Sequence, residues 1–230
     1  MPRIARVVVP DMPHHVTHRG NNRQPVFFVD DDRRAYLDTL REQCGRFRVA
    51  LLGYCLMTNH VHLVLSPATA DGLARAVGTT HVRHASYINR LHGRSGHLWA
   101  GRFFSCPLDE VHFWRTLVYV ERNPVRAKLT RRAWTYPWSS AAVHVGDRPN
   151  DGLLDLDDWR QATRRLDWRA ELTRPEDAAL GRQIQRSTFA GRPLGSDRFV
   201  AKLETLIGRR LRALPRGRPK KAKPAVKVRR

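Results

Sequence analysis

The first half of the chain alternates between short apolar runs with the period of a strand and longer segments with the period of a helix. Strands are expected at His15–Arg19, Val49–Met57, His60–Ser66 and Leu98–Ser105. Helices are expected at Asp31–Arg46, at Ala70–Leu91 and from Asp109-Glu110 onward, since acidic residues suit a helix N-terminus. This order predicts an antiparallel sheet with helices packed on it, an α+β fold of the ferredoxin-like type.

After Gly146 the chain becomes polar and rich in turn residues. A short helix is expected at Asp155–Leu166, and two more at Pro175–Arg186 and Ser196–Ile207, the last with Ser196 as N-cap and Gly208 just past its end. The two later helices are either simple packing elements or a small helical DNA-binding unit. The expected organisation is a folded domain over 1–145, a polar connector over 146–174, a small helical region over 175–211 and a basic tail over 212–230.

Charge narrows the class of partner. Lys and Arg total 42 against 21 Asp and Glu, a formal net charge of +21. The segment Arg209–Arg230 holds 11 basic residues and no acidic one, which leaves 21 − 11 = +10 for residues 1–208. Because the body is basic as well as the tail, a polyanion such as nucleic acid is favoured, although charge alone does not separate DNA from RNA or a membrane surface.

Cysteine content and hydropathy bound the setting. The three cysteines, Cys44, Cys55 and Cys106, are odd in number and lack CxxC spacing, so neither a disulfide framework nor a cysteine zinc site is indicated. The N-terminal apolar stretch is too short for a signal peptide, and nowhere do about eighteen apolar residues run together. The expectation is a soluble cytoplasmic protein without a membrane partner.

Two histidines stand out on the third expected strand. Side chains alternate along a strand, so His60 and His62 emerge on one face roughly 6.5 to 7 Å apart. Apolar flanks embed them in a central strand, where unsatisfied polar groups are costly. They are either polar residues on a half-exposed strand or ligands of a metal ion. Imidazole ligands alone do not identify which ion is bound. The sequence also leaves open whether any histidine of the first strand approaches the same metal: His14, His15 or His18.

A tyrosine and an asparagine share a helical face downstream. Tyr119 and Asn123 are four residues apart, hence on one face and about 6 Å apart along the axis. The face is predicted to carry His112, Arg115, Tyr119, Arg122, Asn123 and Arg126, and the buried side Val111, Trp114, Leu117, Val118 and Val120. A phenol with a pKa of about 10 is a poor nucleophile at neutral pH, but arginines and a divalent cation favour phenolate. Alternatively Tyr119 is a packed aromatic, and Asn123 caps the turn at Pro124.

Four ordered motifs together resemble the single-tyrosine HUH transposases, in particular the REP-associated tyrosine transposases of bacteria. They are His15–Asn21 (HVTHRGN), Met57–Leu63 (MTNHVHL), Trp99–Phe103 (WAGRF) and Tyr119–Ala127 (YVERNPVRA). The resemblance covers Val7–Val145 and assigns an HUH catalytic domain to residues 1–145. It implies that Tyr119 attacks a DNA phosphodiester to give a 5′-phosphotyrosine link and a free 3′-hydroxyl.

The same resemblance implies a divalent cofactor, Mg²⁺ or Mn²⁺, held by His60 and His62. Asn123 matches the position of a third polar ligand, where related transposases often have glutamine. Catalysis would be transesterification, which needs neither ATP nor water.

The resemblance also implies DNA as partner, in the form of single-stranded hairpins, bound by a monomer or homodimer at the bacterial nucleoid. The candidate DNA-binding residues are Arg19, Trp99, Arg102, Arg115, Arg122, Arg126, Arg216 and Arg218. For Trp99, the alternative to base stacking is packing in the core. The last two lie in Pro215–Lys221, which resembles an AT-hook, a motif whose extended Arg-Gly-Arg enters the minor groove. The alternative is a solvated basic tail that raises DNA affinity without specificity.

Two other classes of function remain open from the residues alone. A hydrolytic metalloenzyme would use His60 and His62 to activate water, and a Tyr119→Phe variant would retain much of its activity. A non-catalytic nucleic-acid binder, such as a repressor or an RNA chaperone, would need no metal. Only the transposase reading requires the tyrosine hydroxyl and the two imidazoles to meet at one phosphate.

Overall fold

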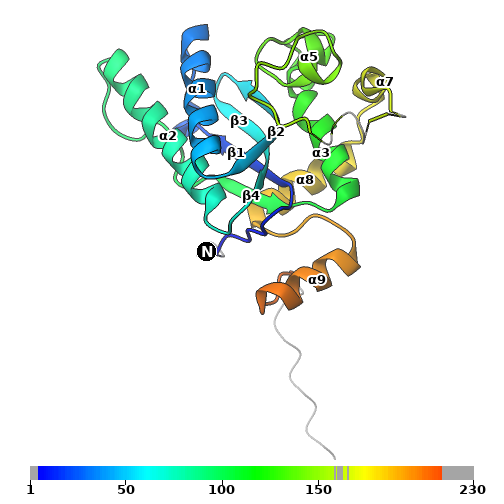
Figure 1. Cartoon of the computed structure of the whole chain (residues 1–230). Coiled ribbons are helices and arrows are strands. Elements are labelled where there is room, and N and C mark those ends of the chain that lie inside the picture. Colours follow the sequence, from blue (N-terminus) through cyan, green and yellow to red (C-terminus); the bar gives the residue numbers. More distant parts are fainter. Residues whose placement is uncertain (1–4, 158, 160–162, 165, 214–230) are drawn as a thin grey trace, which may run out of the picture.

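The computed structural model describes residues 5–157, 159, 163–164 and 166–213. Its centre is a four-stranded sheet in which every neighbouring pair is antiparallel, in the order β2-β3-β1-β4 (Figure 1). The strands are β1 (His14–Arg19), β2 (Val49–Met57), β3 (His60–Pro67) and β4 (Phe104–Pro107). With helices packed on this sheet, the predicted α+β fold is confirmed.

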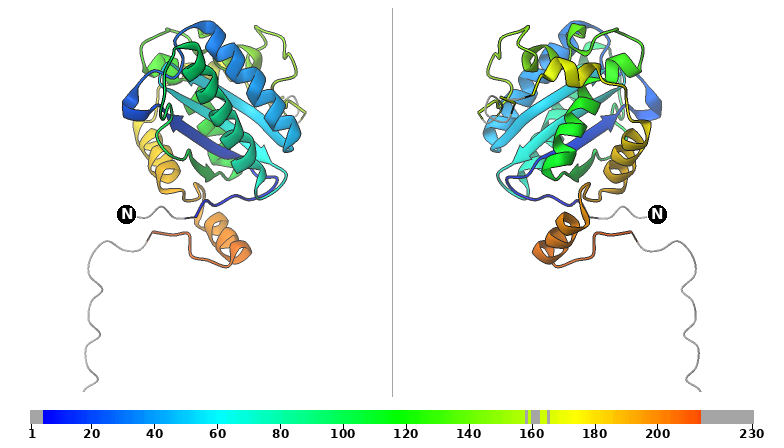
Figure 2. Two further views of the ribbon diagram at one scale, coloured as in Figure 1. Left: turned by 90° about the vertical axis from the view of Figure 1, so that its left-hand side faces the viewer. Right: turned by 90° about the vertical axis from the view of Figure 1, so that its right-hand side faces the viewer.

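Helices cover both faces of the sheet. On one face lie α1 (Asp30–Arg46) and α2 (Gly72–Leu91), as Figures 1 and 2 show. The other face is covered by α3 (Glu110–Glu121) and α8 (Ala178–Ala190). The shorter helices are α4 (Asn123–Arg126), α5 (Ala141–His144), α7 (Trp168–Thr173) and α9 (Asp197–Ile207), with 3-10 turns at Asn21–Arg23 and Ala133–Thr135.

The two faces have separate cores. Alternate residues of the strands, such as Val16 and Leu63, pack with α1 and α2. Residues of the opposite parity, such as Val64 and Cys106, join Leu117 of α3 and Ile184 of α8 in a second cluster. The segment after residue 145 therefore packs into the same body as the sheet, and α9 forms a third, smaller cluster with the N-terminal segment around Val7.

Strand pairing places Thr17 and Arg19 of β1, with His60 and His62 of β3, on the face covered by α3 and α8. In the register, Thr17 lies opposite His62 and Arg19 opposite His60. Because directly opposed residues point to the same side of a sheet, these side chains share one surface.

The fourth strand differs from its predicted position. It begins at Phe104 rather than Leu98, because Gly101 adopts φ +66°, a left-handed conformation that breaks the extended run. Residues Leu98 and Trp99 form a buried loop. The backbone of Trp99 pairs with that of Gly20 in an isolated β-bridge, outside the four strands.

The helices bear out the predicted caps better than the predicted faces. Helix α3 opens at Asp109-Glu110 as expected, with Asp109 as its N-cap accepting a hydrogen bond from the backbone N–H of His112. Val111, predicted to be buried, is 56% exposed. Ser196 caps α9 and Gly208 ends it in the left-handed region, as predicted.

Three expectations about the second half of the chain have other outcomes. Helix α8 runs from Ala178 to Ala190 rather than over Pro175–Arg186, since Asp177 is its N-cap. The helix expected at Asp155–Leu166 falls partly on residues outside the described ones, and the tail from residue 214, with its AT-hook-like motif, lies wholly outside them. Over the described part of the chain, no helix is both long and apolar enough to cross a membrane.

The end of α3 is fixed by a buried carboxylate. Glu121 has no exposed surface, and its Oε1 accepts hydrogen bonds from the Ser140 hydroxyl and from Nδ1 of His144, the latter at 2.5 Å. Its Oε2 accepts from Nε1 of Trp168 at 2.8 Å. One side chain thus ties α3 to α5 and α7, two residues after Tyr119.

Replacing this carboxylate is expected to destabilise the protein. In a Glu121→Ala variant the buried donors of His144 and Trp168 lose their acceptor, which costs about 3 to 5 kcal/mol of unfolding free energy. Urea unfolding, monitored by circular dichroism, measures this loss of unfolding free energy. Glu110→Ala, an exposed change on the same helix, should cost less than about 1 kcal/mol. Equal losses in both variants would show that the hydrogen bonds of Glu121 do not stabilise the protein.

Several histidines are buried in the neutral form, and this links stability to pH. Burial lowers the pKa of His14 and His84 to about 4 and that of His15 to about 3. In the unfolded chain these groups take up protons near pH 6.5, so between pH 6.5 and 4 the unfolded state binds more protons than the folded state. Stability is therefore full above pH 6.5 and is lost as the pH falls.

We expect the unfolding free energy to drop steeply between pH 6.5 and 4, by about 1.4 kcal/mol per pH unit for each such histidine. Urea titrations at half-unit pH steps measure this slope. A His84→Gln variant should show a shallower slope, whereas His92→Gln, at an exposed position, should not change it. A wild-type stability that is flat over this range would refute the linkage.

Candidate active site

A pocket of about 330 Å³ opens on the sheet face below α3 and α8. Its wall includes the predicted nucleophile Tyr119 and all three predicted metal ligands, His60, His62 and Asn123. They come from β3, from α3 and from α4, so residues about sixty positions apart in sequence meet in one cavity. The remaining lining residues are His15, Thr17, His18, Arg19, Asn59, Ala100, Phe104, Arg126, Gln185, Thr188 and Phe189.

His60 has one ring nitrogen engaged and one available. Its Nδ1 lies 2.7 Å from the side-chain oxygen of Asn59, which can only accept, so Nδ1 carries the proton and Nε2 keeps its lone pair. Burial, with a smaller contribution from Arg19 and Arg126, lowers the pKa of His60 to about 4. The imidazole is therefore neutral near pH 7, the form that binds metals.

His62 and Asn123 are held in a similar way. Nδ1 of His62 lies 2.9 Å from Nε2 of His15, and burial lowers the pKa of His62 well below its usual value. The amide nitrogen of Asn123 donates to the carbonyls of Tyr119 and Val120, at 3.3 and 3.2 Å. Nε2 of His62 and Oδ1 of Asn123 remain as the atoms of these side chains without a hydrogen-bond partner among the described residues.

These three side chains fit a divalent metal. Two imidazole nitrogens and one amide oxygen, with their other polar atoms committed to the protein, form a ligand set that leaves further coordination positions for substrate oxygens. No group of three or more His, Cys, Asp or Glu side chains that could hold a metal occurs within the described ranges. The third ligand in this pocket would accordingly be an amide rather than a carboxylate.

Tyr119 is buried but reaches the same pocket. It is 7% exposed, and its ring lies edge-on to the ring of His62, with 5.8 Å between centroids. Its hydroxyl accepts a hydrogen bond of 3.1 Å from Nε2 of Gln185. The guanidinium of Arg126 lies 4.1 Å from the centroid of the tyrosine ring, so a fixed positive charge adjoins the hydroxyl-bearing side chain.

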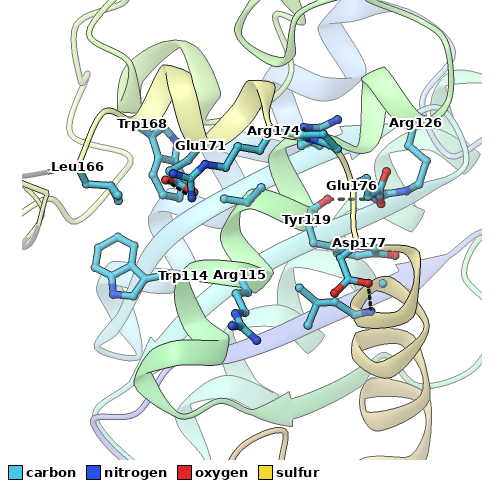
Figure 3. Close-up of a pocket in the computed structure, with 15 residues that line it drawn as sticks. Trp114, Arg115, Tyr119, Arg126, Leu166, Trp168, Glu171, Arg174, Glu176 and Asp177 are labelled. Atoms are coloured by element: carbon cyan, nitrogen blue, oxygen red, sulfur yellow. Dashed lines mark hydrogen bonds and ion pairs between the residues drawn. The ribbon is translucent and has the colours of Figure 1, made fainter.

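A second pocket, of about 710 Å³, lies on the other side of the same tyrosine, between α3 and the segment from Leu166 to Gly181 (Figure 3). Tyr119 and Arg126 line both pockets, and Arg126 is paired with Glu176. Arg115 lines it as an exposed residue. Arg122 lines it too, but its guanidinium donates to the carbonyls of Leu172 and Arg174 and so orders the chain there.

The other predicted DNA-binding residues are scattered. Arg19 is exposed at the rim of the first pocket, and Arg102 is exposed in the loop before β4. Trp99 is 6% exposed, stacks on His18 with 4.9 Å between ring centroids, and donates from Nε1 to the carbonyl of His81. Trp99 thus packs in the core, the alternative to base stacking that its sequence leaves open. Arg216 and Arg218 lie outside the described residues.

Sequence reasoning left out three residues of the site. For His15 the sequence leaves its approach to the metal open; alternation sets it on one face with Thr17, and the pairing of Thr17 with His62 brings that face to the pocket. Gln185 and Thr188 come from α8, and nothing in their local sequence indicates that they reach the site. Their contribution follows only from how α8 packs on β1 and β4.

Comparison with known families gives one match. The family model described as "Transposase IS200 like" matches residues 8–123. A search of the curated proteins gave no match.

Two solved structures are similar to this chain. One is a REP-associated tyrosine transposase bound to a REP hairpin, with a TM-score of 0.52 and 14% identity, covering 68% of this chain and 90% of that one. The other is a putative transposase from Deinococcus radiodurans R1, with a TM-score of 0.38 and 22% identity, covering 53% of this chain and 97% of that one. The similarity to the REP-associated tyrosine transposase supports the fold described above.

The geometry of the ligand set predicts metal binding in solution. Titration of purified protein with Mn²⁺, followed by electron paramagnetic resonance, should reveal a site that is weakened at least about tenfold in His60→Ala, His62→Ala and Asn123→Ala. His92→Ala, an exposed histidine elsewhere, is the matched control. Unchanged affinity in the first three variants, or an equal loss in the control, would rule out this ligand set.

Proposed function

The chain belongs to the IS200-like transposase family, and we propose from this premise that it cleaves and rejoins single-stranded DNA through a covalent bond to Tyr119. One observation carries the proposal. The tyrosine, the two β3 histidines and Asn123 line one pocket of about 330 Å³, which is the convergence that a reaction at a single phosphate requires.

In the proposed reaction the Tyr119 oxygen forms a bond to phosphorus and the bond from phosphorus to the 3′ oxygen breaks. The phenolic proton is lost and the departing 3′ oxygen gains one, leaving a 5′-phosphotyrosine and a free 3′-hydroxyl. Because one phosphoester replaces another, a second 3′-hydroxyl can reverse the step and join two strands. Gln185, which donates to the tyrosine hydroxyl, orients this nucleophile.

His60, His62 and Asn123 would hold a divalent cation, Mg²⁺ or Mn²⁺. When bound, the cation supplies Lewis-acid polarisation of the scissile phosphate. The protein's own part is to keep both imidazoles neutral by burial and to present their Nε2 atoms on one side of the sheet. Asn123 adds an oxygen from the turn that follows α3.

Fixed positive charges would receive the DNA backbone. Arg19 and Arg126 flank the pocket from β1 and α4, and Arg115 lines the adjoining pocket on α3. Arg102 is exposed beside β4. Arginine pairs readily with phosphate, and such contacts attract the backbone without reading its sequence. The basic tail with Arg216 and Arg218 would add affinity that falls as salt rises.

The substrate form is inferred from the fold. The similar structure with the higher TM-score is described as bound to a REP hairpin, and a hairpin presents single-stranded flanks from which a phosphodiester can enter a narrow pocket. We therefore propose single-stranded DNA with a hairpin as the substrate class, met at the nucleoid of a bacterial cytoplasm.

A covalent adduct is the decisive test. Purified protein incubated with end-labelled hairpin DNA and Mn²⁺ should give a labelled band that migrates with the protein on a denaturing gel. Tyr119→Phe should abolish the band, because it removes the attacking oxygen, and His62→Ala should reduce it by at least about a hundredfold. Tyr87→Phe, a tyrosine on α2 away from both pockets, is the control and should retain wild-type levels.

Other outcomes identify other functions. If Tyr119→Phe still cleaves the DNA and no adduct forms with wild type, the site activates water and the protein is a metal-dependent nuclease. If wild type binds the hairpin with and without Mn²⁺ but never cleaves it, the protein is a binder rather than an enzyme. Either result would overturn the proposed strand transfer.

A further inference from the structure

Helix α8 contacts the site at two places, Tyr119 on α3 and His15 on β1. A Cβ atom on Gly181 would lie 3.6 Å from Cε2 of Tyr119, so the helix backbone packs closely against the ring. Gln185, one turn later, donates to the tyrosine hydroxyl, and Thr188 reaches His15 on β1. All three residues belong to one helical face by their spacing of four and three, and all lie beyond residues 8–123, the part that the family model matches.

The direction of each hydrogen bond around Thr188 follows from its single hydroxyl proton. That proton is donated to the carbonyl of Ile184, one turn earlier, at 2.8 Å. Toward Nδ1 of His15, 2.8 Å away, the Thr188 oxygen therefore acts as acceptor, so His15 carries its proton on Nδ1. Nε2 of His15 is then an acceptor.

The same logic extends to the metal ligand. Nε2 of His15 lies 2.9 Å from Nδ1 of His62, and an acceptor there requires the His62 proton to sit on Nδ1. Nε2 of His62 is left with its lone pair. If each hydrogen bond in this series pointed the opposite way, the proton of His62 would sit on Nε2, where a metal must bind.

The surroundings support this direction. His15 is 1% exposed, and a doubly protonated, charged imidazole is costly to bury without a counter-ion, so the ring carries one proton rather than two. The second lone pair of the Thr188 oxygen faces the thiol of Cys106 at 3.3 Å, and burial raises the pKa of that thiol to about 12, which keeps the S–H donor in place. Every polar atom in this series of hydrogen bonds, from the carbonyl of Ile184 to Nδ1 of His62, has a partner.

We propose that Thr188 and His15 are positioning residues of the metal site: through two successive hydrogen bonds they hold the proton of His62 on Nδ1 and aim its Nε2 at the cation. The proposal rests on the metal site of the proposed function. It makes α8 part of the active site, so metal affinity depends on a helix that carries no ligand itself. Such partners of a ligating histidine typically affect metal affinity by about 10- to 100-fold.

The tautomer can be read directly in metal-free protein. Long-range ¹H–¹⁵N correlation spectra distinguish the protonated from the unprotonated nitrogen of each histidine ring. In wild type, His62 should show its proton on Nδ1. In Thr188→Val, which keeps the shape but removes the oxygen, a substantial Nε2–H population should appear for His62.

Metal affinity provides the second readout. Mn²⁺ binding measured by electron paramagnetic resonance should weaken by about 10- to 100-fold in Thr188→Val, and Thr188→Ser, which restores the hydroxyl, should recover the wild-type value. Thr80→Val is the matched control, because Thr80 is an equally buried helical threonine that donates to the carbonyl four residues earlier, in α2. It should leave both the His62 spectrum and the Mn²⁺ affinity unchanged.

The outcomes separate this inference from the proposed function. If His62 has its proton on Nε2 in wild type, if Thr188→Val changes neither the spectrum nor the affinity, or if Thr80→Val has the same effect, the positioning role is wrong. If the tautomer responds as expected but no DNA adduct forms with Tyr119, the positioning role stands and strand transfer fails. If no Mn²⁺ binds to wild type at all, the positioning role at a metal site is wrong, even where the His62 tautomer responds to Thr188→Val.

Discussion

The pairing register between β1 and β3 is the constraint on which the site depends. It sets Thr17 opposite His62 and Arg19 opposite His60, on the face away from α1 and α2. A slip of one residue would turn both histidines into the apolar core under those helices and expose Val61 and Leu63 in their place. Burying Val61 and Leu63 on one side therefore specifies where the imidazoles emerge on the other, and folding and chemistry rest on the same alternation.

The sheet supplies only half of the site, and two buried polar systems bring the other half to it. Glu121 ties the end of α3 to α5 and α7, which fixes the helix that carries Tyr119. Thr188 and Gln185 connect α8 to the histidines and to the tyrosine hydroxyl. Both systems lie in low-dielectric surroundings, where hydrogen bonds are strong and unpaired groups are costly. The alignment of Tyr119 with His60, His62 and Asn123 is thus a product of the whole body rather than of the motifs alone.

The sequence predicts the elements well where the pattern is local. The strands around His60 follow from alternation, the start of α3 from the acidic pair Asp109-Glu110, and the cap at Ser196 from capping chemistry; the structure has all of them. The sequence leaves the place of Trp99 open, because an aromatic beside a glycine turn can face either solvent or the core, and the packing of His18 and His81 decides it. The partners of Glu121 and the reach of α8 could not be predicted, because they join residues 19 to 173 positions apart through tertiary contacts alone.

The late position of α8 in the chain also sets an order of events. During synthesis, the histidines of β3 and the tyrosine of α3 leave the ribosome well before Thr188 and Gln185 do. Until α8 docks, a nascent chain has the reactive groups without the hydrogen bonds that align them. On the proposed function, the groups that would act on DNA are therefore aligned only once the whole body has folded.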